Sequence, residues 1–313
     1  MITTIKQSLL SSPNKRRILV IGDINIDILY HNVQFGQNRP HKPIKTVGGT
    51  GINASIAFKN EDFFPIIFGK IGADYYGEII LNSLNLEKID SFLEIDKQKP
   101  TCLCNIIYFN NNDILRTVFY DSYNTNDYDI NNLKEVISSI HLDNNDYIFL
   151  SLYLIPHVDF DLKYCSDFYN VLIETKASII IDLVPHDIYD LCTFSELKFI
   201  FDKPVFAIIA EFRTYMALLN AKYRTCELIV PHEPEYLEIA HNFKSYYHIC
   251  RFGTGNISNQ SVYSVDDNNS INYIEKDMDT GYTLLESTMK RGFGDVLTSK
   301  TLKKILSLTN ITL

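Results

Sequence analysis

Short apolar runs that alternate with helical patterns constrain the fold of this 313-residue chain more than any other feature. Arg17–Ile21 is such a run, closed by Gly22 and Asp23. A run that is apolar on both faces is typical of a central parallel strand. Further runs lie at 147–152, 177–181, 205–209 and 248–252, and helical patterns at 161–175, 214–221 and 235–243. The alternation predicts βαβ units and a mostly parallel sheet with helices on both faces.

Two stretches, at about 28–46 and 100–120, interrupt this rhythm. The second contains two strand-like runs joined by an asparagine-rich turn, which is typical of a β-hairpin. We expect the two stretches to fold together as a small β-sheet lid over the edge of the main sheet. Residues 1–15 are expected to form an N-terminal extension, and residues 16–313 to form the domain that carries the lid.

Composition narrows the class of protein. A net charge of −9 argues against a dedicated nucleic-acid binder, which would be expected to present a basic surface. The sequence has no run of about 18 apolar residues, so we expect no membrane-spanning helix. Its six scattered cysteines form no C-x-x-C pair, which favours reduced thiols and a cytoplasmic location.

Two polar clusters follow near the start of the chain. Asp23, Asn25 and Asp27 alternate along one strand, so they share one side and suit the hydroxyls of a sugar, although a solvated strand end has the same pattern. The segment Gly48-Gly49-Thr50-Gly51 precedes Asn53 at the start of a predicted helix. Its glycines let a ligand approach the backbone; a simple turn followed by a helix cap is the alternative.

A third cluster is Gly292-Phe293-Gly294-Asp295, which directly precedes a helical pattern. The free amides and the positive dipole end of a helix N-terminus favour an anion there. An acid at that position can take a proton from a hydroxyl that attacks the phosphorus of the anion. A glycine loop whose aspartate only caps the helix is the alternative.

Together these segments resemble the ribokinase-like (PfkB) carbohydrate kinases. Gly48-Gly49-x-Gly51-x-Asn53 and the following Phe68-Gly69-Lys70-Ile71-Gly72 are similar to the N-terminal signature of that family, and Gly292-x-Gly294-Asp295 is similar to its C-terminal signature. The resemblance runs from about residue 17 to residue 308. It implies a three-layer αβα sandwich with a β-sheet lid. It also implies ATP-dependent phosphorylation of a hydroxyl on a sugar or nucleoside-like molecule, with Mg²⁺.

The resemblance also implies roles for individual residues. Asp295 would be the general base, and the amides of Gly292, Phe293 and Gly294 would form the anion hole. The expected substrate-binding residues are Asn25, Asp27, Gly48, Gly49 and Asn53. The expected nucleotide-binding residues are Arg251, Gly253 and Gly255. Because lids of this family sometimes form dimer interfaces, a homodimer through the lid is also expected.

Two departures from the family pattern leave a second hypothesis open. Met289-Lys290-Arg291 stands where the family usually has Asp-Thr, and Ala210-Glu211-Phe212-Arg213 replaces an N-x-x-E segment that helps to organise Mg²⁺. Glu211, or the segment His232-Glu233-Pro234-Glu235, is then the candidate for metal binding. A pseudokinase that binds a sugar or nucleotide is the alternative to an active kinase. A weak G-x-G-x-x-A match from Gly49 makes a dinucleotide-dependent oxidoreductase a distant third.

Overall fold

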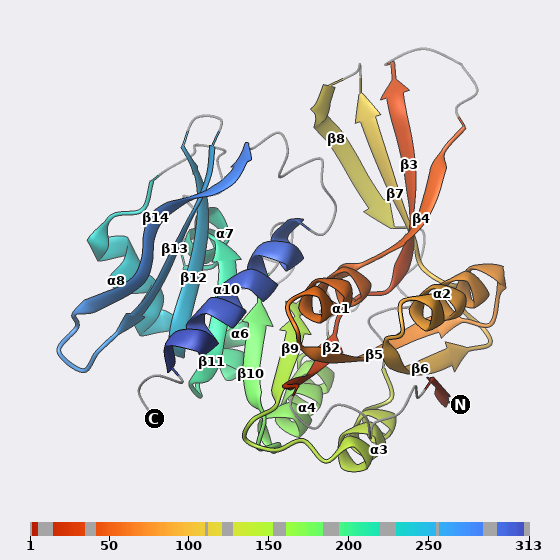
Figure 1. Ribbon diagram of the computed structural model, residues 1–313, viewed down its shortest axis with the longest axis horizontal. Helices are drawn as coiled ribbons and strands as arrows, with labels where there is room; N and C mark the ends of the chain where they lie inside the picture. Colours follow the sequence, from red (N-terminus) through yellow and green to blue (C-terminus); the bar gives the residue numbers. More distant parts are fainter. Residues whose placement is uncertain are drawn as a thin grey trace.

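The structure is a computed structural model that describes residues 2–5, 15–34, 42–109, 112–120, 128–152, 161–183, 194–219, 230–254, 257–283 and 293–309. Within these ranges the chain forms one large sheet covered by helices and one small sheet that stands out from it (Figure 1). None of the described helices is both long and apolar enough to cross a membrane.

The large sheet has ten strands in the order β1-β6-β5-β2-β9-β10-β11-β12-β13-β14. In that order they span Ile2–Ile5, Asp90–Asp96, Phe64–Gly72, Arg17–Ile21, Tyr147–Ser151, Ser178–Asp182, Val205–Glu211, Ser245–Thr254, Ile257–Val265 and Ile271–Thr283. All pairs from β6 to β12 are parallel, whereas β1, β13 and β14 join antiparallel to their neighbours. The parallel part therefore contains every strand that the apolar runs predicted.

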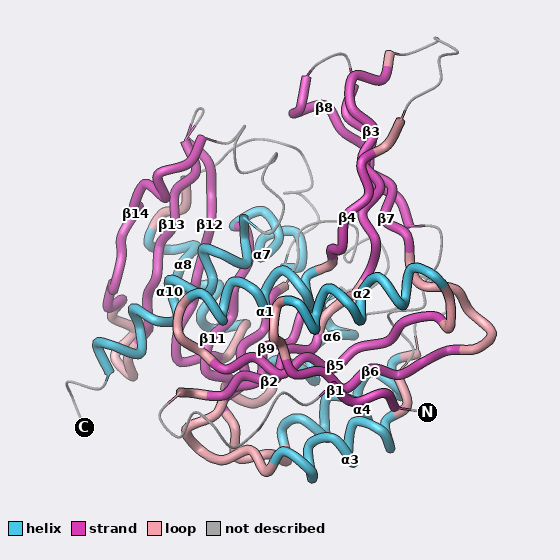
Figure 2. Tube along the Cα trace, turned by 45° about the vertical axis from the view of Figure 1, so that its right-hand side comes forward, coloured by secondary structure: helices cyan, strands magenta, loops and turns pink. Residues whose placement is uncertain are grey.

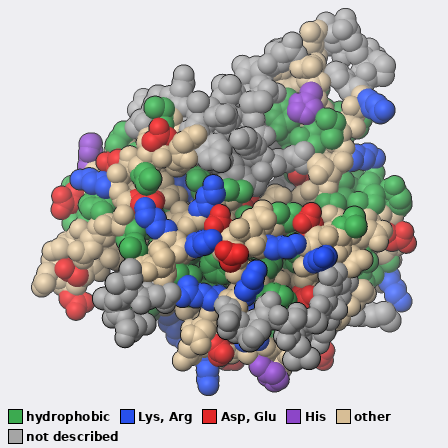
Figure 3. Space-filling model, in the orientation of Figure 1, with side chains coloured by type: hydrophobic (Ala, Val, Ile, Leu, Met, Phe, Trp, Pro, Cys, Tyr) green, Lys and Arg blue, Asp and Glu red, His purple; other side chains and the backbone are tan. Residues whose placement is uncertain are grey.

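Helices cover both faces of this sheet (Figures 1 and 2). One face carries α1, α2 and α10, which span Thr50–Asn60, Tyr75–Leu86 and Phe293–Thr309. The other carries α3, α4, α6, α7 and α8, which span Ile130–Ile140, Leu162–Ile173, Phe194–Phe201, Phe212–Leu219 and Glu233–Asn242. The predicted three-layer αβα sandwich is confirmed. Over the first face, lysines and acidic side chains are interspersed (Figure 3), as where Lys303 of α10 pairs with Asp62 at 3.1 Å.

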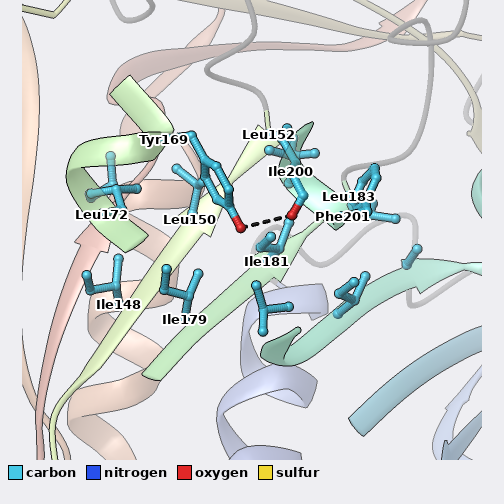
Figure 4. Close-up of a cluster of buried hydrophobic side chains, with 14 of the residues drawn as sticks. Ile148, Leu150, Leu152, Tyr169, Leu172, Ile179, Ile181, Leu183, Ile200 and Phe201 are labelled. Carbon is cyan, nitrogen blue, oxygen red and sulfur yellow. Dashed lines mark hydrogen bonds between the residues drawn. The ribbon is translucent and has the colours of Figure 1, made fainter. Parts of the chain in front are cut away.

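The alternation of side chains along each strand explains why the runs are continuously apolar. In β2, Leu19 and Ile21 pack on the side of α3 and α4, whereas Ile18 and Val20 pack on the side of α1 and α10. All four are fully buried. Figure 4 shows the first of these two cores, where the hydroxyl of Tyr169 donates to the carbonyl of Ile200 at 2.9 Å.

The small sheet is the predicted lid, with strand order β4-β3-β7-β8. These strands span Ile44–Gly48, Asn25–Val33, Leu103–Phe109 and Asn112–Tyr120. Strand β3 is longer than expected, because it begins at Asn25 within the polar cluster and runs into the lid without a break. Cys104 is buried with Leu29 in the lid core, in agreement with a packed thiol.

The N-terminal residues depart from expectation in part. Ile2–Ile5 lie within the expected extension but form β1, which pairs antiparallel with β6 at the edge of the large sheet. Residues 6–14 lie outside the described part of the chain, and the boundary near residue 15 stays a prediction.

The packing of α10 gives a test of this architecture. Leu302 is fully buried between α10, α1 and the sheet, so replacing it with alanine leaves a cavity. We expect Leu302→Ala to lower the free energy of unfolding by about 2–5 kcal/mol. Leu308, on the same helix but 44% exposed, is the matched control, and Leu308→Ala should cost less than about 0.5 kcal/mol. Urea unfolding followed by circular dichroism measures both; equal losses would contradict this placement of α10.

Candidate active site

Three charged side chains meet at the carboxyl ends of adjacent parallel strands. Asp182 is the last residue of β10 and Glu211 the last of β11, while Arg251 lies in β12 in register with Glu211. Their strands turn Ile180, Ile209 and Ile249 toward α10. Because side chains alternate with period two, Asp182, Glu211 and Arg251 face the same side, beyond the end of that apolar core. Open parallel sheets bind their ligands at this edge.

The N-terminus of α10 reaches the same place. The helix begins at Phe293, so Gly294 and Asp295 lie in its first turn, and Asp295 is only 6% exposed. A Cβ atom on Gly294 would lie 3.2 Å from Nη1 of Arg251, so the guanidinium packs against the helix start. The predicted glycine segment therefore lies at a helix start, but Phe293 and Gly294 already belong to the helix, and Gly292 lies outside the described residues.

The charges around Asp295 determine its protonation. Burial raises the pKa of Asp295 well above its ordinary value, and the nearby carboxylates of Asp182 and Asp23 raise it further. The positive charge of Arg251 opposes this rise in the pKa of Asp295. Three strands and one helix thus bring three carboxylates and one guanidinium into a single electrostatic cluster.

Arg251 is held by two neighbours. Its Nη2 donates to Oγ1 of Thr298 at 2.7 Å, and its Nε donates to Oε1 of Gln260 at 3.4 Å. Gln260 in turn donates through Nε2 to Oγ1 of Thr301 at 2.9 Å, which fixes its amide so that the carbonyl oxygen faces the arginine. The half-buried guanidinium is thereby oriented by groups from β13 and α10.

Asp23 joins the sheet to α1. Its Oδ1 accepts from the amide of Thr50 at 3.0 Å and also from the Thr50 hydroxyl, and its backbone carbonyl accepts from the amide of Gly51 at 2.9 Å. Gly49 adopts φ 92°, and a Cβ there would lie 2.3 Å from the carbonyl oxygen of Asp23. Burial raises the pKa of Asp23, while the bonds from Thr50 lower it. Only glycine fits this close approach without strain.

The predicted substrate-binding residues lie beside this junction. Asn25 is 2% exposed and donates through Nδ2 to Oδ2 of Asp23 at 3.1 Å, while its Oδ1 is buried with no hydrogen-bond partner in the described part of the chain. Gly48 faces Asp27, since a Cβ on Gly48 would lie 2.3 Å from Oδ2 of that aspartate. Asn53 lies in the first turn of α1, where its amide donates to the carbonyl of Gly49 at 3.0 Å. The structure therefore brings these five residues together.

The structure describes some, but not all, of the residues expected to bind the nucleotide and the metal ion. Gly253 is buried in β12 two residues after Arg251, whereas Gly255 lies outside the described residues. Oε2 of Glu211 accepts from Nε of Arg213 at 2.5 Å. The carboxylate of Glu235 accepts from the amide of His232 at 2.8 Å and so caps α8. Among the described residues, no group of three or more His, Cys, Asp or Glu side chains is arranged to hold a metal ion.

Several supporting residues were missed in the sequence. Thr50 has a direct role in holding Asp23, and Thr298 and Gln260 orient Arg251. Thr50 carried a weak signal, since it stands among glycines at a helix start. Thr298 and Gln260 carried none, because each resembles an ordinary polar residue and meets its partner only in the folded chain.

Comparison with solved structures supports the fold. Phosphofructokinase-2 from Escherichia coli in complex with fructose-6-phosphate superimposes with a TM-score of 0.65 at 14% identity, over 93% of this chain and 88% of that one. Anopheles gambiae adenosine kinase superimposes with a TM-score of 0.65 at 14% identity, over 93% of this chain and 92% of that one. Ribokinase from Giardia lamblia superimposes with a TM-score of 0.63 at 12% identity, over 83% of this chain and 75% of that one. At such low identities these similarities establish the fold alone.

The family itself is established by sequence. A comparison with curated proteins found no match to the chain. Residues 15–177, which are more than half of the chain, match the pfkB family carbohydrate kinases, and this range contains the lid strands, the Asp23 junction and the glycine segment. The sequence match and the ribokinase-like architecture agree, and the chain belongs to the pfkB family of carbohydrate kinases.

Proposed function

We propose that this protein is an ATP-dependent kinase that phosphorylates a hydroxyl group of a sugar or nucleoside-like molecule. The observation that carries the proposal is the buried carboxylate of Asp295 in the first turn of α10, at the carboxyl edge of the sheet. Asp295 takes the proton of the acceptor hydroxyl as its oxygen attacks the terminal phosphorus. The amides of Gly292, Phe293 and Gly294, with the positive end of the α10 dipole, stabilise charge on the transferring group.

The arrangement around Asn25 supports a hydroxyl-bearing acceptor. A carboxylate only accepts hydrogen bonds, so Asp23 fixes the Asn25 amide with Nδ2 toward itself and Oδ1 turned away. That buried oxygen has no partner in the described chain, and the carboxylate of Asp27 is a further acceptor at the site. Gly48, Gly49 and Asn53 complete the proposed acceptor site. Fructose-6-phosphate and adenosine, named with two structural neighbours, are examples of hydroxyl-bearing molecules.

For ATP, we propose that Arg251, Gly253 and Gly255 lie along the nucleotide, with its phosphates toward α10. For Mg²⁺, we propose Glu211 as the protein ligand. Mg²⁺ at kinase sites is commonly held by one or two carboxylates together with substrate phosphates, so it needs no larger cluster of protein ligands. Glu211 can hold the ion if its carboxylate gives up the hydrogen bond from Arg213 and binds the ion instead. When bound, the ion would neutralise charge between the phosphates.

The pairing of Glu211 with Arg213 also favours the second candidate, a pseudokinase that binds a sugar or nucleotide in a regulatory role. In that case the carboxylate stays with Arg213, and Asp295 stays protonated in its buried site. The retained aspartate at the helix start is our reason to rank this candidate second, because a protein that only binds has no use for a base there.

We further propose a cytoplasmic protein that pairs through its lid as a homodimer. The reduced state of the described cysteines, which are buried and free, is compatible with this compartment. In support of this, the lid stands out from the body of the protein (Figure 1).

The kinase proposal is tested by ATP consumption with Mg²⁺ against a panel of sugars and nucleosides. We expect acceptor-dependent turnover that Asp295→Asn lowers by about 10²–10⁴-fold, because the amide cannot accept the proton, while ATP binding persists. Unchanged turnover in Asp295→Asn would remove the assigned base. Acceptor or ATP binding without turnover across the panel would favour the pseudokinase.

The raised pKa of Asp295 predicts how activity depends on pH. Only the ionised carboxylate accepts a proton, so kcat/KM should rise with pH up to the raised pKa, with an acid limb well above the value of about 4 for an ordinary aspartate. Stability should respond in the opposite direction, since ionising the buried carboxylate is unfavourable. The gain in Tm of Asp295→Asn over the native protein should therefore grow as pH rises from about 4, the ordinary value for an aspartate, to the raised pKa, and should level off above it. A constant difference in Tm across pH would contradict a raised pKa.

The acceptor site is tested at Asn25. We expect Asn25→Ala to lower kcat/KM for the acceptor by about 10–100-fold, since a substrate hydroxyl loses its buried hydrogen-bond acceptor, with little change in KM for ATP. Asn82→Ala, at an exposed position on α2, is the matched control and should behave as the native protein. Equal kinetics in the two variants would exclude contact between Asn25 and the acceptor.

A further inference from the structure

Arg251 lies near the carboxyl end of β12, a strand inside the large sheet. An arginine is unusual there, because a half-buried guanidinium loses much of its hydration. Burial lowers the pKa of Arg251, and the nearby carboxylates of Asp182, Asp295 and Glu211 compensate. Each of these acids comes from a different element: β10, α10 and β11. Asp23, which follows β2, acts on the same cluster through Asp295. The fold thus supplies a site in which one arginine is stable among several acids.

The guanidinium is also fixed in orientation. Thr298 holds Nη2 at 2.7 Å and Gln260 accepts from Nε, so two of its three nitrogens are engaged. The third, Nη1, has no hydrogen-bond partner among the described residues, and it is the nitrogen that lies against Gly294. Gly294 leaves the space that a Cβ would take from it. The free donors of Arg251 are therefore directed at the start of α10.

We propose that Arg251 is a catalytic residue whose Nη1 donates to the transferring phosphoryl group beside the first amides of α10. This rests on the kinase function proposed above. The acceptor oxygen forms a bond to the terminal phosphorus of ATP, the bond from that phosphorus to the ADP oxygen breaks, and the proton passes to Asp295. Arg251 stays protonated throughout and stabilises the charge on the equatorial phosphoryl oxygens.

The same charge has a second effect on Asp295. Three carboxylates close together disfavour the ionisation of Asp295, and the positive charge of the Arg251 guanidinium opposes this effect. Arginine suits this double role because its planar fork is oriented by Thr298 and Gln260 while one nitrogen remains for phosphate. A lysine would keep the charge but lose the fixed geometry.

The experiment compares Arg251→Met and Arg251→Lys with Lys300→Met, which removes one exposed positive charge from α10 and serves as the control. Circular dichroism first establishes that each variant is folded. Titration calorimetry then measures the affinities for ATP and for ADP, which lacks the transferring phosphoryl group, and steady-state kinetics measure kcat over pH. Binding needs no turnover, so it tests the phosphate contact separately from the kinase proposal.

We expect Arg251→Met to lower kcat by about 10²–10³-fold and to move the acid limb of the profile to higher pH. The preference for ATP over ADP should fall in the same variant. Arg251→Lys should keep the position of the acid limb while kcat stays reduced, and Lys300→Met should match the native protein. If the native protein binds ATP without turnover and Arg251→Met alone loses the preference for ATP, the kinase proposal fails but the phosphate contact stands.

Native kcat, pH profile and ATP preference in a folded Arg251→Met variant would overturn the inference. A native protein that binds ATP no better than ADP would also overturn it, since the terminal phosphate would then not be held at Nη1.

Discussion

The hydrogen bonds of the Asp23 carboxylate are the interaction on which the rest of this structure depends. One side chain accepts from Thr50 at the start of α1 and from Asn25 at the start of β3, and it belongs to the segment that leaves β2. It therefore joins the central sheet, the first covering helix and the root of the lid. Gly49 approaches the Asp23 carbonyl so closely that no other residue fits without strain.

The site places acids where hydration is lost, which opposes folding. Asp23 and Asp295 are both almost fully buried, and burial raises the pKa of each. Hydrogen bonds from Thr50 offset this for Asp23, whereas Asp295 relies on Arg251 and on the N-terminus of α10. Asp295 is thus less well compensated than Asp23. An acid in this state is poorly suited to a purely structural role and better suited to proton transfer.

Much of the fold could be predicted from sequence because local patterns decided it. Residues 18–21 are buried on both faces of the sheet and are therefore all apolar, and Asp295 lies in the first turn of the helix that begins in the glycine segment. Strand β6 was not predicted, because it carries Asp90 and Glu94 inside the protein. Glu94 is stabilised there by Asn132 and by the backbone of residue 129, contacts that no local pattern reveals.

The candidate site was predictable in its positions but not in its electrostatics. Asn25 and Asp27 were recognised from their alternation, and the structure places both at the carboxyl end of the sheet. The orientation of Arg251 depends on Thr298, 47 residues further along the chain, and on Gln260 in a strand that the apolar runs did not indicate. Strand β13 can contain many buried polar residues because it pairs with β12 and β14 and because the side chain of Gln260 forms a hydrogen bond with α10.

Two of the strands that connect the lid to the body, β3 and β4, have a mechanical consequence. Strand β3 runs from Asn25 through Asp27 to Val33, and β4 returns to Gly48, directly before the Gly49 turn. The proposed acceptor ligands are therefore built into the stalk of the lid, not into a separate wall. Any tilt of the lid must displace Asp27 relative to Asp295. If the proposed acceptor site is correct, acceptor affinity therefore depends on the angle of the lid, and a contact that restrains the lid also changes the acceptor site at its base.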